Sequence, residues 1–280
     1  AMLKAHGDFA LPQNVPANQF LNLEGRKFSK SKGWVIEQHQ YLKDFESFHN
    51  KEDALRYALI RTLPENKDGD FKWDEFVALH DNELVANLGN FVNRVTSLTH
   101  KNFAAKVPAY TAAAKLKDIE EGAVVTVAAA MQQLKHKIEL LEASITKYEF
   151  KQAVQLLMEI SSYGNTLLQR NEPWKIWKQD PESVEAAALL NLSLQIVTAL
   201  SVISQPFLPF SSAQMRNLLA LDPVKDGSLT QLKIQLEQAG VLIEEGHQIE
   251  APQLLFAKIN DRKDKSRMEL VEQQKEKLKQ

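Results

Sequence analysis

Two lysines lie three residues apart in a short polar loop near the start of the chain, Gly25-Arg-Lys27-Phe28-Ser29-Lys30-Ser31-Lys32-Gly33. Lys27 and Lys30 carry ammonium groups, and Ser29 and Ser31 place hydroxyls beside them. Such a loop can close on phosphates and put positive charge where negative charge develops during phosphoryl or nucleotidyl transfer. On composition alone, a solvated basic loop is the commoner interpretation of such a run.

A second pair of side chains lies further along, where Asn90 and Arg94 are four residues apart in a helical pattern. Residues four apart share one face of a helix. An amide beside a guanidinium can recognise the edge of a nucleobase, because both groups make planar, directional hydrogen bonds. The alternative is an ordinary polar helix face or an interhelical hydrogen bond.

The third segment is rich in tryptophan and positive charge, Arg170-Asn-Glu-Pro173-Trp174-Lys175-Ile-Trp177-Lys178. Pro173 interrupts a helix and is expected to present Trp174 among the cations. An exposed indole in such a place can stack on an unpaired base. The alternative is that the tryptophans plug the end of a helical bundle, which we expect for Trp177.

Composition narrows the classes of function. The chain has 280 residues, a formal net charge of −2 and no cysteine. The small net charge argues against a nonspecific polyanion binder, although a reader of one RNA feature needs only a local basic patch. Lack of cysteine excludes disulfides and thiol catalysis, and the seven histidines are scattered, so we expect no metal site. No apolar run is long enough for a membrane span and no signal sequence is seen, so we expect a cytoplasmic protein that does not contact membranes.

The elements that must position these residues are mainly helices. Apolar residues recur every three to four positions, which predicts an all-α helical bundle after a short strand-like start at Phe20–Leu23. The expected helices run over residues 51–63, 72–104 with a break at Gly89, 115–145, 146–169 from a capping box at Thr146, 181–204 from a cap at Asp180, and 212–221. We also expect a polar turn at 65–70, a hairpin within 240–256, and a solvated or frayed helix at 261–280.

The three segments together resemble the methionyl-tRNA synthetase family. Lys27-Phe-Ser-Lys-Ser31 is similar to the KMSKS signature of class I aminoacyl-tRNA synthetases, with phenylalanine in place of methionine. The resemblance implies that Lys27, Ser29, Lys30 and Ser31 bind ATP, with Lys27 and Lys30 acting catalytically in the parent enzyme. Asn90, Arg94 and Trp174 correspond to the anticodon-reading residues of the family, with Trp174 stacking on the first base of CAU. Asn87 and Lys175 are further expected neighbours.

This resemblance also implies a division of the chain. Residues 1–35 would be the end of the Rossmann-type α/β catalytic domain, 36–75 a linking and stem-contact region, 76–225 the anticodon-binding bundle, and 226–280 a return segment and charged tail. The HIGH signature, methionine pocket and zinc-bearing insertion of the family lie upstream of this segment, and no His-x-Gly-His occurs here. We therefore expect a fragment that needs no cofactor and is inactive alone.

The parent enzyme would use ATP and Mg²⁺, with zinc in the upstream insertion, to activate methionine and ligate it to its tRNA. The expected partners of this chain are the methionine tRNA anticodon stem-loop and the catalytic domain of the same protein. Two alternatives stay open. One is a non-catalytic helical interaction module without an RNA role, and the other is the anticodon-binding region of another class I synthetase, such as the valine or leucine enzyme.

Overall fold

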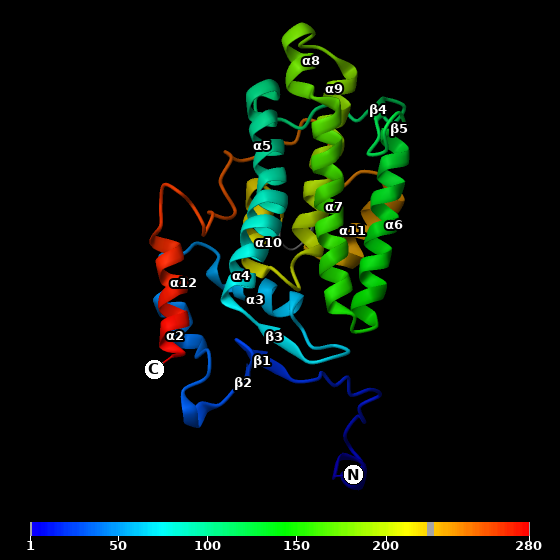
Figure 1. Cartoon of the computed structure of the whole chain (residues 1–280). Helices are drawn as coiled ribbons and strands as arrows, with labels where there is room; N and C mark the ends of the chain where they lie inside the picture. The colour runs from blue at the N-terminus through cyan, green and yellow to red at the C-terminus, as the bar shows by residue number, and fades with distance from the viewer. Residues whose placement is uncertain (1, 223–226, 280) are drawn as a thin grey trace.

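The computed structural model describes residues 2–222 and 227–279. As predicted, most of these residues form a helical bundle, which stands above a small sheet (Figure 1). The long helices α6 (Val127–Thr146), α7 (Phe150–Asn171) and α9 (Val184–Ile203) pack against one another, and α5 (Asn90–Phe103) packs on α7 and α9. The short helix α8 (Pro173–Gln179) caps the upper end of the bundle in Figure 1.

Helix α9 is the centre of the bundle. By length and composition it could cross a membrane, contrary to the expectation that no apolar run is long enough, but nearly all of it is buried inside the protein. Its buried amides have partners, because Asn191 donates to the carbonyl of Pro108 and Gln195 to that of Ile243. The predicted cap at Asp180 is wrong: the Ser183 hydroxyl accepts the Ala186 N–H, while the Asp180 carboxylate closes the preceding turn.

One uninterrupted helical rod carries Asn90 and Arg94. It consists of α4 (Trp73–Leu79), a π-helical segment η2 (His80–Gly89), and α5. The predicted break at Gly89 does not occur, since this residue has φ −63° and ψ −41°. Glycine serves another purpose there, because a Cβ would lie 3.4 Å from the ring of Phe256 and 3.0 Å from the Leu84 carbonyl oxygen.

The helix predicted over residues 115–145 begins later. Its first part is an antiparallel hairpin of β4 (Lys115–Lys117) and β5 (Val124–Thr126), which turns through Gly122 with φ +78°. The β-branched run before residue 127 favours a strand, and Thr126 then caps α6 by accepting the Ala129 N–H. The capping box at Thr146 is wrong, because the Thr146 hydroxyl donates to the Glu142 carbonyl inside α6.

The small sheet joins two distant segments. Its order is β2 (Arg26–Lys27), β1 (Leu21–Leu23), β3 (Gly69–Phe71), with β1 parallel to β3 and antiparallel to β2. Part of the predicted polar turn at 65–70 is therefore strand. Below the rod, α2 (Gln38–Asp44) and α3 (Lys51–Arg61) enclose a second, aromatic core that includes Tyr41, Phe45, Phe48 and Trp73. Helices α1 (Met2–His6) and η1 (Lys30–Lys32) are short.

Asn50 immediately precedes α3, but its side chain makes no cap. The amide donates instead to Gln214 and to the carbonyl of Leu255, in the return segment. Helix α10 (Pro209–Leu218) begins three residues before its predicted start, at a proline that suits a first helical position. Helix α11 (Leu229–Gln238), which the sequence did not predict, follows it.

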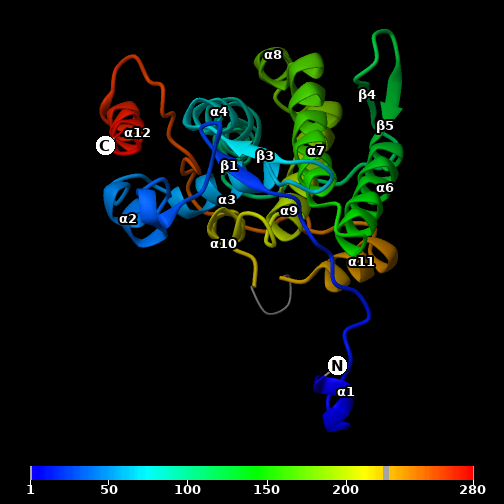
Figure 2. The same cartoon turned by 60° about the horizontal axis from the view of Figure 1, so that its bottom comes forward.

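Residues 240–256 form no hairpin, so that prediction is wrong. The N–H groups of Gly246 and Ile249 donate instead to the carbonyls of Val107 and Ala105. The charged tail forms α12 (Ser266–Lys277), which lies beside α2 (Figure 2). It is docked by buried Val271 and by contacts of Gln274 and Lys277 with Asp44, at 2.8 and 2.5 Å.

Candidate nucleic-acid interface

The rod presents Asn90 and Arg94 on one face, as their spacing predicts. Asn90 is exposed and Arg94 is half-buried. Burial lowers the pKa of the Arg94 guanidinium, but an arginine side chain keeps its charge in proteins. The rod therefore offers a neutral amide and, one turn further along, a cation that has lost part of its hydration.

Trp174 is positioned by the junction of α7 and α8. Helix α7 ends at Asn171, Glu172 takes a left-handed conformation with φ +45°, and Pro173 starts α8 as its first residue. Trp174 stays partly exposed. Trp177 points inward, 7% exposed, and packs edge-on against Phe103, as expected for a residue that plugs the bundle end.

The structure brings Arg94 and Trp174 into direct contact. The guanidinium carbon lies 5.0 Å from the centre of the indole ring, a cation–π distance. An Arg94 amino group also donates to the Gln169 side-chain oxygen at 3.4 Å. One face of the indole is therefore covered by a fixed cation, and the ring remains partly open to solvent.

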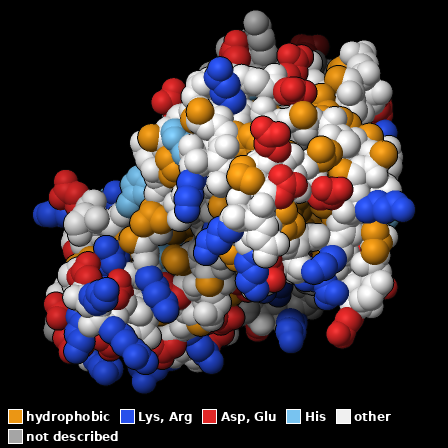
Figure 3. Space-filling view, turned by 90° about the horizontal axis from the view of Figure 1, so that it is seen from above, with side chains coloured by type: hydrophobic (Ala, Val, Ile, Leu, Met, Phe, Trp, Pro, Cys, Tyr) orange, Lys and Arg blue, Asp and Glu red, His pale blue; other side chains and the backbone are white. Residues whose placement is uncertain are grey.

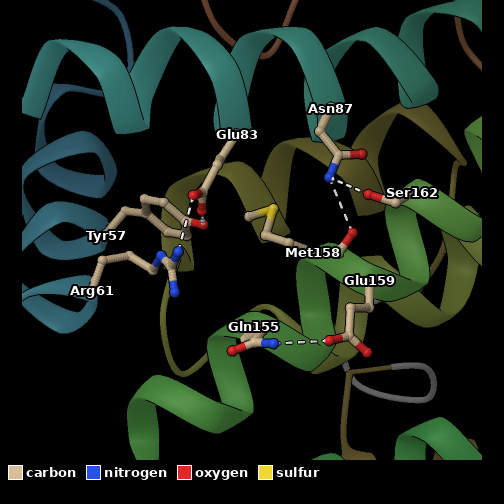
Figure 4. Close-up of polar contacts among 8 residues, drawn as sticks. All are labelled: Tyr57, Arg61, Glu83, Asn87, Gln155, Met158, Glu159 and Ser162. Carbon is tan, nitrogen blue, oxygen red and sulfur yellow. Dashed lines mark hydrogen bonds and ion pairs between the residues drawn. The ribbon is translucent and has the colours of Figure 1, made fainter. Parts of the chain in front are cut away.

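Asn87 is used within the protein. Its amide donates to the Met158 carbonyl at 3.0 Å and to the Ser162 hydroxyl at 2.9 Å (Figure 4). Its oxygen accepts from Asn165 at 3.2 Å. Both amide hydrogens are thus engaged, and Asn87 holds η2 against α7. Lys175 is exposed and forms an ion pair of 2.7 Å with Glu172.

Sequence reasoning missed the α7 residues that support the rod. Ser162, Asn165 and Gln169 are three and four residues apart, so they share the α7 face that meets η2 and α5. The spacing of these three residues was visible in the sequence, but the residues that they contact on the rod were not. Glu83 of η2 instead joins the rod to α3, since it accepts from the Tyr57 hydroxyl and from Arg61, both on α3 (Figure 4).

The Lys27–Lys32 loop lies at the other end of the molecule, near β1 and β2 in Figure 1. Its backbone is closed by two hydrogen bonds between Ser29 and Trp34, of 2.9 and 3.0 Å, and by Gly33 with φ +67°. The Trp34 indole N–H donates to the Leu23 carbonyl at 2.7 Å. The hydroxyls of Ser29 and Ser31 lie 3.3 Å apart.

Lys27 and Lys30 are both exposed. The Lys27 ammonium lies 5.6 Å from the centre of the Phe20 ring. Among the described residues, neither Lys27 nor Lys30 forms an ion pair with a carboxylate. Their positive charge is therefore available to an anion. No group of three or more potential metal ligands occurs within the described ranges.

Charges of both signs share the upper surface of the bundle. Figure 3, seen from above, shows lysines and arginines interspersed with acidic side chains. Such a surface has no strong field of one sign, so recognition there must depend on local contacts such as the Arg94–Trp174 pair.

Two protein-family models match the chain. The family of class I tRNA synthetases (M) matches residues 1–96, and the anticodon-binding domain of methionyl-tRNA ligase matches residues 107–274. Methionine–tRNA ligases of Christiangramia forsetii and Flavobacterium psychrophilum are 43% and 40% identical to this chain, each over 97% of it and 37% of their own length. The chain thus spans little more than a third of these curated relatives.

A solved structure has the same fold. It is that of Mycobacterium tuberculosis methionyl-tRNA synthetase bound by methionyl-adenylate, which aligns with a TM-score of 0.69 and 21% identity. The alignment covers 86% of this chain and 43% of the other. At this identity the likeness supports the fold only.

Proposed function

The chain belongs to the methionyl-tRNA synthetase family, and from this premise we propose that it binds the CAU anticodon loop of methionine tRNA at the upper end of its bundle. The observation that carries the proposal is the stacked pair of Arg94 and Trp174, with exposed Asn90 one turn away on the same rod. A flat aromatic face beside a fixed cation suits an unpaired base, and a neighbouring amide suits its hydrogen-bonding edge.

The geometry gives each side chain a separate task. Because Arg94 covers one face of the indole, the first anticodon base stacks on the free part of Trp174. Arg94, oriented by Gln169, and Asn90 then donate to the edges of anticodon bases. Asn87 positions the rod through α7, and Lys175 lies beside the site as a screened cation.

We further propose that the whole protein activates methionine with ATP and ligates it to this tRNA in the cytoplasm. In that reaction Lys27 and Lys30 stabilise the phosphates of ATP, with Ser29 and Ser31 as hydrogen-bonding partners. Exposure of both lysines, free of carboxylate partners among the described residues, supports this role. Any Mg²⁺ would arrive with the nucleotide. The 280-residue chain alone is expected to bind RNA without catalysing the reaction.

Filter binding tests the anticodon proposal. The RNAs are a methionine tRNA anticodon stem-loop and a variant changed at its first anticodon base. We expect a preference for CAU that Trp174→Ala abolishes, with affinity falling about 5- to 150-fold, since stacking contributes about 1–3 kcal/mol per base. Phe210→Ala, which truncates an aromatic side chain 53% exposed elsewhere, is the control and should bind as the wild type. Equal weak binding of both RNAs, unchanged by Trp174→Ala, would favour a bundle in which Trp174 only packs.

A further inference from the structure

A pocket of about 350 Å³ opens on the rod beside Asn90. Its volume lies within the roughly 300–1,000 Å³ of small-molecule sites. The rod and the return segment line it with Val85, Ala86, Gly89, Asn90, Asn93, Leu254, Leu255 and Phe256. Because an α-helix turns about 100° per residue, Asn93 and Arg94 lie on opposite sides of Asn90, one turn further along. Asn90 therefore stands between the Arg94–Trp174 pair and this pocket.

The lining suits an uncharged, planar group. Every lining residue is uncharged, so no side chain there carries a charge that would attract a phosphate or a metal ion. Asn90 and Asn93 bring two amides, and neither side chain has a hydrogen-bond partner among the residues that the structure describes. Leu254, 63% exposed, and Phe256, 3% exposed, supply apolar surface. Amides next to apolar side chains are what an unpaired nucleobase requires.

The outer wall of the pocket is held in place from behind. Asn50 donates to the Leu255 carbonyl at 2.8 Å, and Gln214 donates to the Leu254 carbonyl at 3.3 Å. On the rod side, Phe256 packs over Gly89, where an added Cβ would be in ordinary contact with its ring at 3.4 Å. The pocket is thus preformed, which lowers the entropy lost when a ligand binds.

We propose that this pocket receives a second unpaired base of the same RNA loop, next to the base that stacks on Trp174. The inference rests on the proposed anticodon function and extends it by assigning Asn93 and Leu254 to base recognition. Asn93 hydrogen-bonds the base edge, and Leu254 packs on the base face. Asn90 lies between the two bases and can contact either.

Two substitutions test the pocket without touching Trp174 or Arg94. Ala86→Phe fills the pocket from an exposed helix position, and Asn93→Ala removes one amide. Gln133→Ala, an exposed amide on α6, is the matched control. Affinity for the CAU stem-loop is measured by filter binding, together with stem-loops in which each loop nucleotide in turn is abasic. Circular dichroism melting checks that each variant folds.

We expect Ala86→Phe to weaken binding about 5- to 150-fold, the range for losing one stacked base. Asn93→Ala should weaken it about three- to tenfold, the range for one hydrogen bond. One of the abasic RNAs should bind the wild type more weakly than the intact RNA does. The same abasic RNA should bind Ala86→Phe as tightly as the intact RNA does. The nucleotide that lacks its base in this RNA would then be the one whose base enters the pocket. The control should bind unchanged.

The outcomes separate this inference from the proposed function. If both pocket variants bind as the wild type while Trp174→Ala loses the CAU preference, the pocket inference is overturned and the anticodon proposal stands. A second outcome is that Ala86→Phe weakens binding, but each abasic RNA loses as much affinity for this variant as it does for the wild type. In that case no base enters the pocket, and the inference is again overturned. If Trp174→Ala keeps the CAU preference and both pocket variants bind as the wild type, the anticodon proposal and the pocket inference are both overturned.

Discussion

Replacing Arg94 with lysine separates the shape of this side chain from its charge. The guanidinium is half-buried, lies 5.0 Å from the Trp174 ring centre and donates to Gln169, so its plane has a defined orientation. Lysine keeps the positive charge but lacks the plane and the forked donors. A cation–π contact contributes about 0.5–2 kcal/mol depending on desolvation, and a well-aligned contact to a base about 1–3 kcal/mol.

We therefore expect Arg94→Lys to weaken binding of the CAU stem-loop by about 1–3 kcal/mol, which corresponds to about 5- to 150-fold. The slope of log affinity against log salt should stay unchanged, because the charge is retained. Arg94→Ala should weaken binding and also reduce the slope by about 0.7 if the side chain neutralises one phosphate of a single strand. Filter binding across a salt series measures both quantities. Wild-type affinity in Arg94→Lys would refute the argument, since Arg94 would then act as a charge alone.

Two predictions concern stability. Gly164→Ala should lower the free energy of unfolding by at least about 1–3 kcal/mol, because a Cβ there would lie 2.2 Å from the buried Phe91 ring. Urea unfolding measures this loss, and Gln155→Ala on the exposed face of α7 is the control that should change the free energy little. Burial lowers the pKa of His80 despite its 3.0 Å contact with Asp81. The His80 side chain therefore binds a proton more readily in the unfolded chain than in the folded protein. The free energy of unfolding should fall as the pH drops below about 6.5. Urea unfolding from pH 8 to pH 5 should show this loss, and His80→Gln should remove that part of it; an equal slope in both proteins would contradict the assignment.

Local sequence patterns predicted most of the bundle, since helices such as α5 and α7 bury regular apolar faces. They failed where non-local partners decide the structure. The segment around Gly246 pairs with Val107 rather than with itself, a contact that spans more than a hundred residues and leaves no local signature. They failed again at residues 115–126, because apolar positions in a short hairpin can fall at helical spacing.

For the candidate site, the residue types were readable but their neighbours were not. Asn90 and Arg94 followed from helical spacing, and Trp174 from the proline before it. The stacking of Arg94 on Trp174 depends on how α7 ends and how α5 packs beside it, which only the tertiary structure supplies. Whether these residues read an anticodon stays a prediction until RNA binding is measured.

The supports behind the site suggest how it would gain specificity. Gln169 orients Arg94, Asn87 fixes η2 against α7 through Met158 and Ser162, and Asn50 holds the wall at Leu255. Each support is a polar contact between two different segments of the chain. In the proposed complex, the protein would therefore order little on binding, and most of the ordering cost would fall on the RNA loop. In a preformed site, a wrong base leaves protein donors unpaired, and an unpaired buried donor costs about 1–3 kcal/mol. Discrimination between loops would then arise from the penalty for mismatched bases more than from extra attraction to the correct ones.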